Sequence, residues 1–324
     1  MSSTAILCFL PLTRSLSKQI GKSTSVTLGA YGGLWSLYNS ANVLKNLNEK
    51  TDWRRLERHL LGDTPDIPGI DLKHIASCAW VDHQNHFVEM TLMQGIMMFE
   101  EWCGDFANMF VAAGLKIKAE SFQFPGGHIN KKYTNWIKLD APGAFIRSAL
   151  LECQVQPAFM KKNASNVASL DGLLNWYRYF KSVRNSLAHG GGILDQYSLD
   201  LYNVAVSTTL KSLGMSRDYS SPAPIVGSRA DISLPDSLLL LGVVQRIAFA
   251  FDAKYCNVAK AEEEVESRVV TALQKMEVPI NVSVEQKNRW LRKLWVNATG
   301  TSIKDVSKVE EWFTHKGLVT IKVF

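Results

Sequence analysis

The chain has few of the residues that would make it a disulfide-rich or membrane-spanning protein. Of its 324 residues five are cysteines, an odd number, and no two form a Cys-x-x-Cys pair. This spacing suits neither a disulfide framework nor a zinc site, so we expect reduced thiols in a cytoplasmic protein. No apolar run approaches the ~18 residues of a membrane span, Leu238–Val244 included, and we expect no membrane partner.

Strand signals are also scarce. The sequence shows neither repeated alternation of apolar and polar residues nor the alternating strand–helix units of a parallel sheet. One short exception is Leu318–Val323, which could form a terminal strand. The sequence therefore predicts an all-α fold with at most one small strand.

What is present is ordinary globular composition with a basic excess. The residues are 46% hydrophobic and 20% charged, enough to bury a sizeable core, and the net charge is +6. A positive balance suits a polyanionic partner without proving one. The excess is clearest at the C-terminal end, where residues 285–324 hold eight Lys or Arg against four Asp or Glu.

Apolar spacing predicts most of the helices. The best supported is Leu170–Ala188, which ends at three successive glycines, and a longer one runs over Phe87–Ala113. Helical patterns also cover the following ranges: Val43–Leu61, Ala144–Gln154, Asp195–Leu213, Ser237–Ala261 and Glu262–Lys275. Ser169 is expected to cap the best-supported helix.

These patterns suggest four regions. Residues 1–70 form an N-terminal helical extension, residues 71–215 a helical domain, residues 216–236 a connector rich in Ser, Pro and Gly, and residues 237–324 a basic C-terminal helical region. The C-terminal region also contains Trp290, Trp295 and Trp312. Together with its basic charge these could bind nucleic acid, although tryptophans at such spacing more often fill a core.

The residues best suited to chemistry stand at the end of the Leu170–Ala188 helix. Arg184 is followed directly by Asn185, and His189 comes five positions after the arginine, just before the glycines. A guanidinium can bind two phosphate oxygens, and an imidazole can move a proton near neutral pH. At helical pitch Asn185 and His189 share a face, so the amide could orient the ring.

Spacing alone does not single out this pair, because Arg54 and His59 are separated in the same way. The neighbours of Arg54 include Arg55 and Arg58, which is typical of a solvated helix face. Arg184 and His189 could also have a purely structural role. Arg184 could complement the helix dipole, and His189 could cap the last carbonyl groups of the helix. The glycine loop favours the chemical reading, because glycine lets a phosphate or a partner backbone come close.

The run Arg184-Asn185-Ser186-Leu187-Ala188-His189-Gly190 resembles the motif of the HEPN superfamily, in which Arg, often followed by Asn, precedes His by four to six residues. By helix pattern the resemblance extends over residues 87–214 and leaves out the first seventy and last ninety residues. It implies a helical bundle that dimerises and cuts RNA, as toxins and antiviral effectors of this superfamily do. It also implies an acidic or polar residue on the preceding long helix, for which Glu100 and Glu101 are candidates, although an exposed face is the plainer reading of both.

These inferences lead to one hypothesis and one alternative. The hypothesis is a metal-independent endoribonuclease acting as a homodimer, with Arg184, Asn185, His189 and Glu100 in its site and a neutralising or activating protein as a further partner. We expect no cofactor or metal, since His83 and His86 lack the zinc-protease spacing. The alternative is a non-catalytic helical interaction module that kept the fold.

Overall fold

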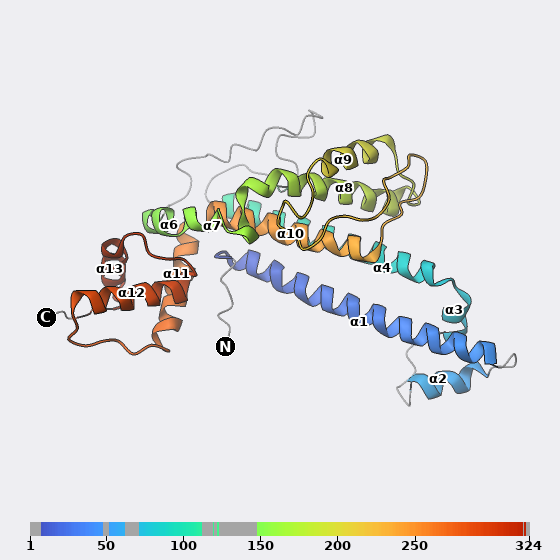
Figure 1. Cartoon of the computed structure of the whole chain (residues 1–324), viewed down its shortest axis with the longest axis horizontal. Helices are drawn as coiled ribbons and strands as arrows, with labels where there is room; N and C mark the ends of the chain where they lie inside the picture. The colour runs from blue at the N-terminus through green and yellow to red at the C-terminus, as the bar shows by residue number, and fades with distance from the viewer. Residues whose placement is uncertain are drawn as a thin grey trace.

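The computed structural model describes residues 8–47, 52–61, 71–111, 119, 122, 148–319 and 321. Within these ranges the chain is all-α, as the sequence predicts, and contains the following elements (Figure 1): α1 Pro11–Leu47, α2 Trp53–Leu61, α3 Leu72–Ser77, α4 Trp80–Val111, α6 Ala149–Gln154, α7 Gln156–Phe159, η1 Asn163–Ser165, η2 Val167–Ser169, α8 Leu170–His189, α9 Gln196–Val206, α10 Leu234–Tyr255, α11 Ala259–Leu273, α12 Val284–Thr299 and α13 Val306–His315.

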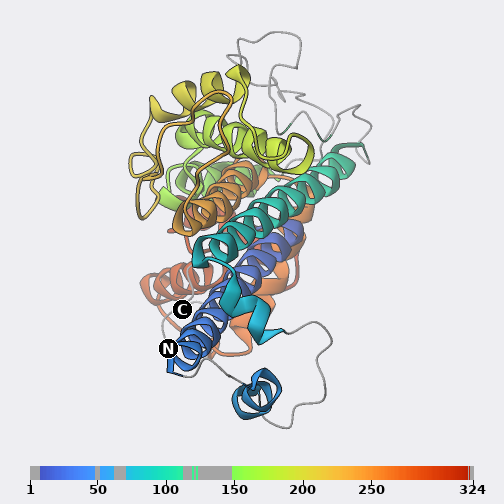
Figure 2. The same cartoon turned by 90° about the vertical axis from the view of Figure 1, so that its right-hand side faces the viewer.

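The bundle is organised around α4 and α10. Helix α4 packs against α1, α8 and α10, α1 also packs against α10, and α9 covers α8. Figure 2 shows α1 and α4 running side by side along most of their length. Helices α11, α12 and α13 gather at the end of the molecule near α6 (Figure 1).

Several predicted helices have different bounds in the structure. The segment predicted as one helix over Val43–Leu61 belongs to two helices, because α1 ends at Leu47 and α2 begins at Trp53. Helix α9 stops at Val206, seven residues before its predicted end at Leu213. Helix α10 starts at Leu234, inside the predicted connector, where Ser233 caps it by accepting a hydrogen bond from the backbone of Asp236.

The possible terminal strand is not seen in the described residues of its segment, Leu318, Val319 and Ile321. The division into four regions stays a prediction. Helices α1 and α10 lie outside the predicted 71–215 domain, yet both pack against α4, so the hydrophobic core extends across those boundaries. Helix α10 is also long and apolar enough to cross a membrane, but 72% of its most apolar window is buried inside the bundle.

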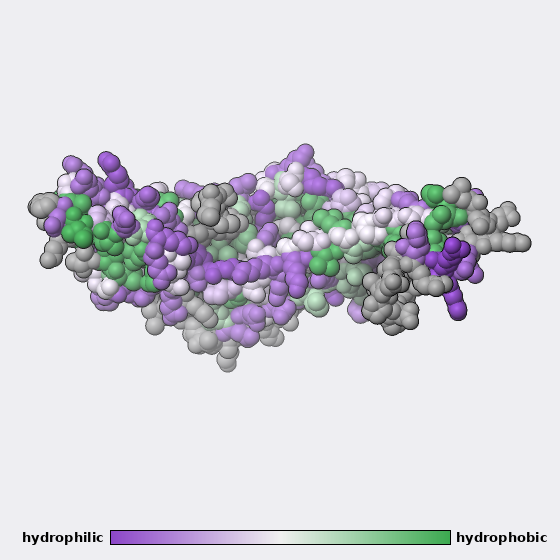
Figure 3. Space-filling model, turned by 90° about the horizontal axis from the view of Figure 1, so that it is seen from below, coloured by the Kyte–Doolittle hydropathy of each residue, from purple (hydrophilic) through white to green (hydrophobic). Residues whose placement is uncertain are grey.

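The face formed by α1 is chemically mixed. Seen from that side, hydrophobic patches are separated by hydrophilic residues (Figure 3). The exposed apolar side chains of α1 include Val26, Trp35 and Val43.

A fully buried carboxylate joins α1 to α10. Asp252 accepts hydrogen bonds at 2.7 Å from the backbone N–H groups of both Phe9 and Leu10, just before α1 begins. Burial raises the pKa of Asp252 to about 7, against the opposing effect of these N–H donors, of Thr13 and of the Arg268 charge. The free-energy cost of burying the ionised carboxylate therefore exceeds the stabilisation that these hydrogen bonds and the Arg268 charge give to it.

The raised pKa predicts a pH dependence of stability. In the unfolded chain the pKa of this carboxyl is near ~3.9, so between about pH 4 and 7 the folded state holds a proton that the unfolded state has lost. Stability should then fall as pH rises, with a slope approaching about 1.4 kcal/mol per pH unit. The measurement is urea unfolding at pH 5 and pH 7 of the wild type and of Asp252→Asn, which is neutral at both. Equal pH dependence of the two proteins would contradict the assignment.

Candidate functional site

Helix α8 forms as predicted and extends one residue further, to His189. Its buried face includes Leu173, Tyr177, Phe180 and Val183, which pack into the core. The expected cap is wrong: Ser169 is the residue before the helix, but its side chain makes no capping hydrogen bond, because the turn η2 leads directly into α8.

The structure brings Glu100 of α4 to Arg184 of α8. The Oε1 atom of Glu100 lies 3.0 Å from Nη2 of Arg184 and 2.7 Å from Nζ of Lys181. Of the two predicted candidates on α4, only Glu100 takes part in this cluster, whereas Glu101 is exposed. One carboxylate therefore holds two cations that lie one helical turn apart on α8.

The environment of this cluster is only partly open to solvent. The side chains of Arg184 and Lys181 are 19% and 17% exposed, and that of Glu100 is 36% exposed. The Nε atom of Arg184 is buried and has no hydrogen-bond partner among the described residues. Such shielding from solvent makes the attraction between Glu100 and Arg184 stronger than that of an ion pair fully in water.

A buried tyrosine lies behind the pair. Tyr177 is two turns before Arg184, its hydroxyl has no hydrogen-bond partner among the described residues, and Lys181 lies over its ring at 6.0 Å. Burial raises the pKa of Tyr177 well above its usual value, and the charge of Glu100 raises it further while that of Arg184 lowers it. Tyr177 is therefore a neutral group at physiological pH, close to the charges of the cluster.

Asn185 and His189 lie on a different side of α8. Both are exposed, and no hydrogen bond between them, or between either side chain and another described residue, is found. Five residues of α-helix turn the side-chain direction by about 140°, so His189 points away from the side that Arg184 presents to Glu100. Within one chain the structure brings Glu100 to Arg184 but does not bring His189 to either of them.

The glycine loop after His189 is tightly built. The carbonyl oxygen of Ser186 accepts hydrogen bonds from the N–H groups of Gly190 at 2.8 Å and Gly192 at 2.9 Å. Gly191 and Gly192 have φ angles of 61° and 83°, in the left-handed region that favours glycine. These angles turn the chain sharply at the end of the helix and fix the position of its last turn.

Residues from the predicted connector hold this loop from outside. Gly192 accepts a hydrogen bond from the backbone of Ala230, and Ile193 forms an isolated antiparallel bridge with Arg229. Arg229 in turn lies 2.9 Å from Glu89 of α4. Sequence reasoning missed Arg229 and Glu89, since they are 37 and 103 residues from Gly192 and no local pattern marks them as neighbours.

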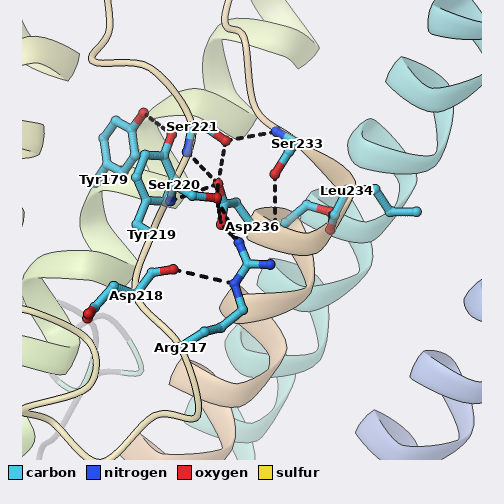
Figure 4. A network of polar contacts seen from close by, with 10 residues as sticks. Tyr179, Arg217, Asp218, Tyr219, Ser220, Ser221, Ser233, Leu234 and Asp236 are labelled. Atoms are coloured by element: carbon cyan, nitrogen blue, oxygen red, sulfur yellow. Dashed lines mark hydrogen bonds and ion pairs between the residues drawn. The ribbon is translucent and has the colours of Figure 1, made fainter.

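The connector itself is fixed by a second buried carboxylate, Asp236 at the start of α10 (Figure 4). It accepts hydrogen bonds from the backbone N–H groups of Ser220 at 3.1 Å and Ser221 at 2.6 Å, and it forms an ion pair with Arg217. Burial raises the pKa of Asp236, but the hydrogen bonds and the Arg217 charge outweigh it, so the pKa is lowered. The segment is thus an ordered part of the bundle.

The chain matches no protein-family model, no curated protein and no solved structure.

The loop geometry predicts that Gly192→Ala destabilises the protein. A Cβ atom at Gly192 would lie 3.1 Å from Arg229 and 3.3 Å from Leu187, and the φ angle of 83° is unfavourable for alanine. We expect a loss of about 1–3 kcal/mol in the free energy of unfolding, measured by urea titration. Gly104→Ala in α4 is the control, because open space surrounds Gly104 and alanine favours helix there. If Gly192→Ala and Gly104→Ala have the same free energy of unfolding, an alanine at position 192 is not strained and the prediction is wrong.

Proposed function

We propose that the protein is a metal-independent endoribonuclease of the HEPN type. The observation that carries the proposal is the Glu100–Arg184 contact: a carboxylate on the preceding long helix holds the motif arginine, as the resemblance implies. At the other end of the motif, His189 is exposed and free of hydrogen bonds to the described residues, next to a rigid glycine loop. A fixed guanidinium and an accessible imidazole suit RNA cleavage.

The reaction uses the nucleophile that RNA itself carries. A base removes the proton of the 2′-hydroxyl, the oxygen attacks the adjacent phosphorus, and an acid protonates the departing 5′-oxygen. His189 serves as a base or an acid, and Arg184 binds the phosphate oxygens as negative charge builds on them. Glu100 orients the guanidinium. The products are a 2′,3′-cyclic phosphate and a 5′-hydroxyl.

A homodimer supplies the second imidazole that one chain lacks. The reaction benefits from two imidazoles, and a twofold axis presents the same patch from both subunits. Exposed apolar side chains lie beside the cluster: Met90 and Met97 of α4 are 65% and 60% exposed and, seven residues apart, share one helix face near Glu100. A stripe of this kind suits contact with a second copy.

The proposed setting is that of a cytoplasmic toxin or antiviral effector, with RNA as substrate and a neutralising or activating protein as a further partner. The alternative is a non-catalytic interaction module. One observation favours it: Arg184 is already paired inside the bundle and points away from His189, so it could serve only to join α4 to α8.

The decisive test is cleavage of RNA in excess EDTA by the wild type and by His189→Ala. We expect the variant to lose at least about 100-fold in rate, the usual contribution of a proton-transferring group, and to keep its stability because His189 is exposed. His315→Ala is the matched control, since His315 is also an exposed residue at the end of a helix, α13. Intact RNA with all three proteins supports the alternative, and full activity of His189→Ala removes this residue from the mechanism.

A second prediction concerns Arg184→Lys. Lysine can keep the ion pair with Glu100 but loses the planar two-point contact with phosphate, so cleavage should fall nearly as far as in Arg184→Ala. The free energy of unfolding should fall less in Arg184→Lys than in Arg184→Ala, because only alanine leaves Glu100 with Lys181 alone. Measured rates close to wild type for Arg184→Lys would mean that Arg184 acts as a simple positive charge.

A further inference from the structure

Helix α12 has an exposed basic face. Arg289, Arg292 and Lys293 fall within about 100° of one another on the helix, all three are exposed, and no ion pair of theirs is found among the described residues. The other cation of this helix, Lys287, lies on a different side and is 2.8 Å from Glu310 of α13. The single acidic residue of α12, Glu285, is exposed on the same side, in the first turn four residues before Arg289, so the three cations outnumber one acid there.

The tryptophans of this region do not contribute to that face. Trp295 is completely buried and Trp312 is 8% exposed, and both pack edge-on against other aromatic rings. Trp290 is partly buried and donates a hydrogen bond to the carbonyl oxygen of Glu277. The interpretation of the tryptophans as core residues is therefore right for Trp295 and Trp312. The exposed face of α12 offers a ligand positive charge.

The basic face is held in a fixed position. A capping box between Ser283 and Gln286 starts α12, and Gly300, with a φ angle of 67°, ends it. Beyond the helix, Gln154 accepts hydrogen bonds from the backbone N–H groups of Lys304 and Asp305. These contacts tie the loop after α12 to α6 of the bundle, so the backbone that carries the three cations is already ordered before they bind.

The opposite face of α12 decides between two anionic partners. A helix that lies in a lipid surface inserts a free apolar face beneath the headgroups, and binding to anionic headgroups by charge alone usually takes about four or more clustered cations. In α12 that face is used by the core, where Leu291, Leu294 and Trp295 are buried. A partner that needs only the charges is the phosphate backbone of a nucleic acid, whose condensed counterions are released when cations replace them.

We propose that Arg289, Arg292 and Lys293 bind the sugar–phosphate backbone of RNA at a site separate from the Arg184–His189 motif. The choice of RNA over DNA rests on the proposed function, whereas the phosphate contact rests on the charges of α12. The surface binds RNA without reading its sequence, because long cationic side chains on an exposed face contact phosphates and not base edges.

The test measures binding of a labelled single-stranded RNA to the full chain by fluorescence anisotropy in EDTA. All proteins carry His189→Ala, so the RNA stays intact and the result does not depend on cleavage. The variant is Arg289→Gln, Arg292→Gln and Lys293→Gln together. Its matched control is Lys18→Gln, Lys22→Gln and Lys45→Gln, which removes three exposed cations of α1 and changes the net charge equally.

We expect the α12 variant to weaken binding at least about tenfold at 0.1 M salt and to reduce the slope of log K against log salt by about 2, for three lost phosphate contacts. The α1 control should change both quantities much less. Equal effects of the two variants, or no RNA binding by the parent protein, overturn the proposal. Binding to vesicles of phosphatidylcholine and phosphatidylserine is measured in the same way. If the α12 variant loses vesicle binding but binds RNA as well as the parent protein, the proposal is also overturned. Failure of cleavage with normal RNA binding would instead overturn only the proposed function.

Discussion

The arrangement of the long helices depends on one buried carboxylate. Helix α1 has no acidic residue in its first turn. The backbone N–H groups of Phe9 and Leu10, which precede the helix, instead donate hydrogen bonds to Asp252 of α10. Thr13 contacts the same carboxylate and accepts a hydrogen bond from the indole of Trp102 on α4. Asp252 of α10 thus holds the start of α1, and Thr13 links the same carboxylate to Trp102 of α4, while α4 and α10 also pack directly against each other.

The position of α4, which packs against α1, α8 and α10, decides the geometry of the candidate site. Trp102 and Glu100 stand two residues apart on α4, so the first faces α1 and Asp252 while the second faces α8 and Arg184. A shift of α4 along its neighbours would separate Glu100 from Lys181 and Arg184 together. The second buried carboxylate, Asp236, fixes the segment that supports the glycine loop. Asp236 thus supports the glycine-loop end of the motif, while Arg184 at the other end is positioned by its contact with Glu100 of α4.

The sequence predicted those parts of the site that depend on local pattern. Periodic apolar residues and three glycines were sufficient to place α8 and its end, because packing of one face and a helix stop are local properties. Helix α1 was missed over most of its length: glycines at 21, 29, 32 and 33 lower its helix propensity, and packing against α4 compensates. The support of Gly192 by the backbone of Ala230 is purely tertiary, so no local pattern could reveal it.

The same distinction explains why the choice between Glu100 and Glu101 needed the structure. Adjacent residues on a helix point about 100° apart, so one of two neighbouring acids can face α8 while the other faces solvent, and the sequence shows only that both are acidic. The structure assigns Glu100 to Arg184 and leaves His189 about 140° from it around α8. A phosphate that must touch both groups cannot lie along one side of a single straight helix. The homodimer proposed above is one arrangement that would bring both groups to the same phosphate, with the arginine of one chain opposite the imidazole of the other.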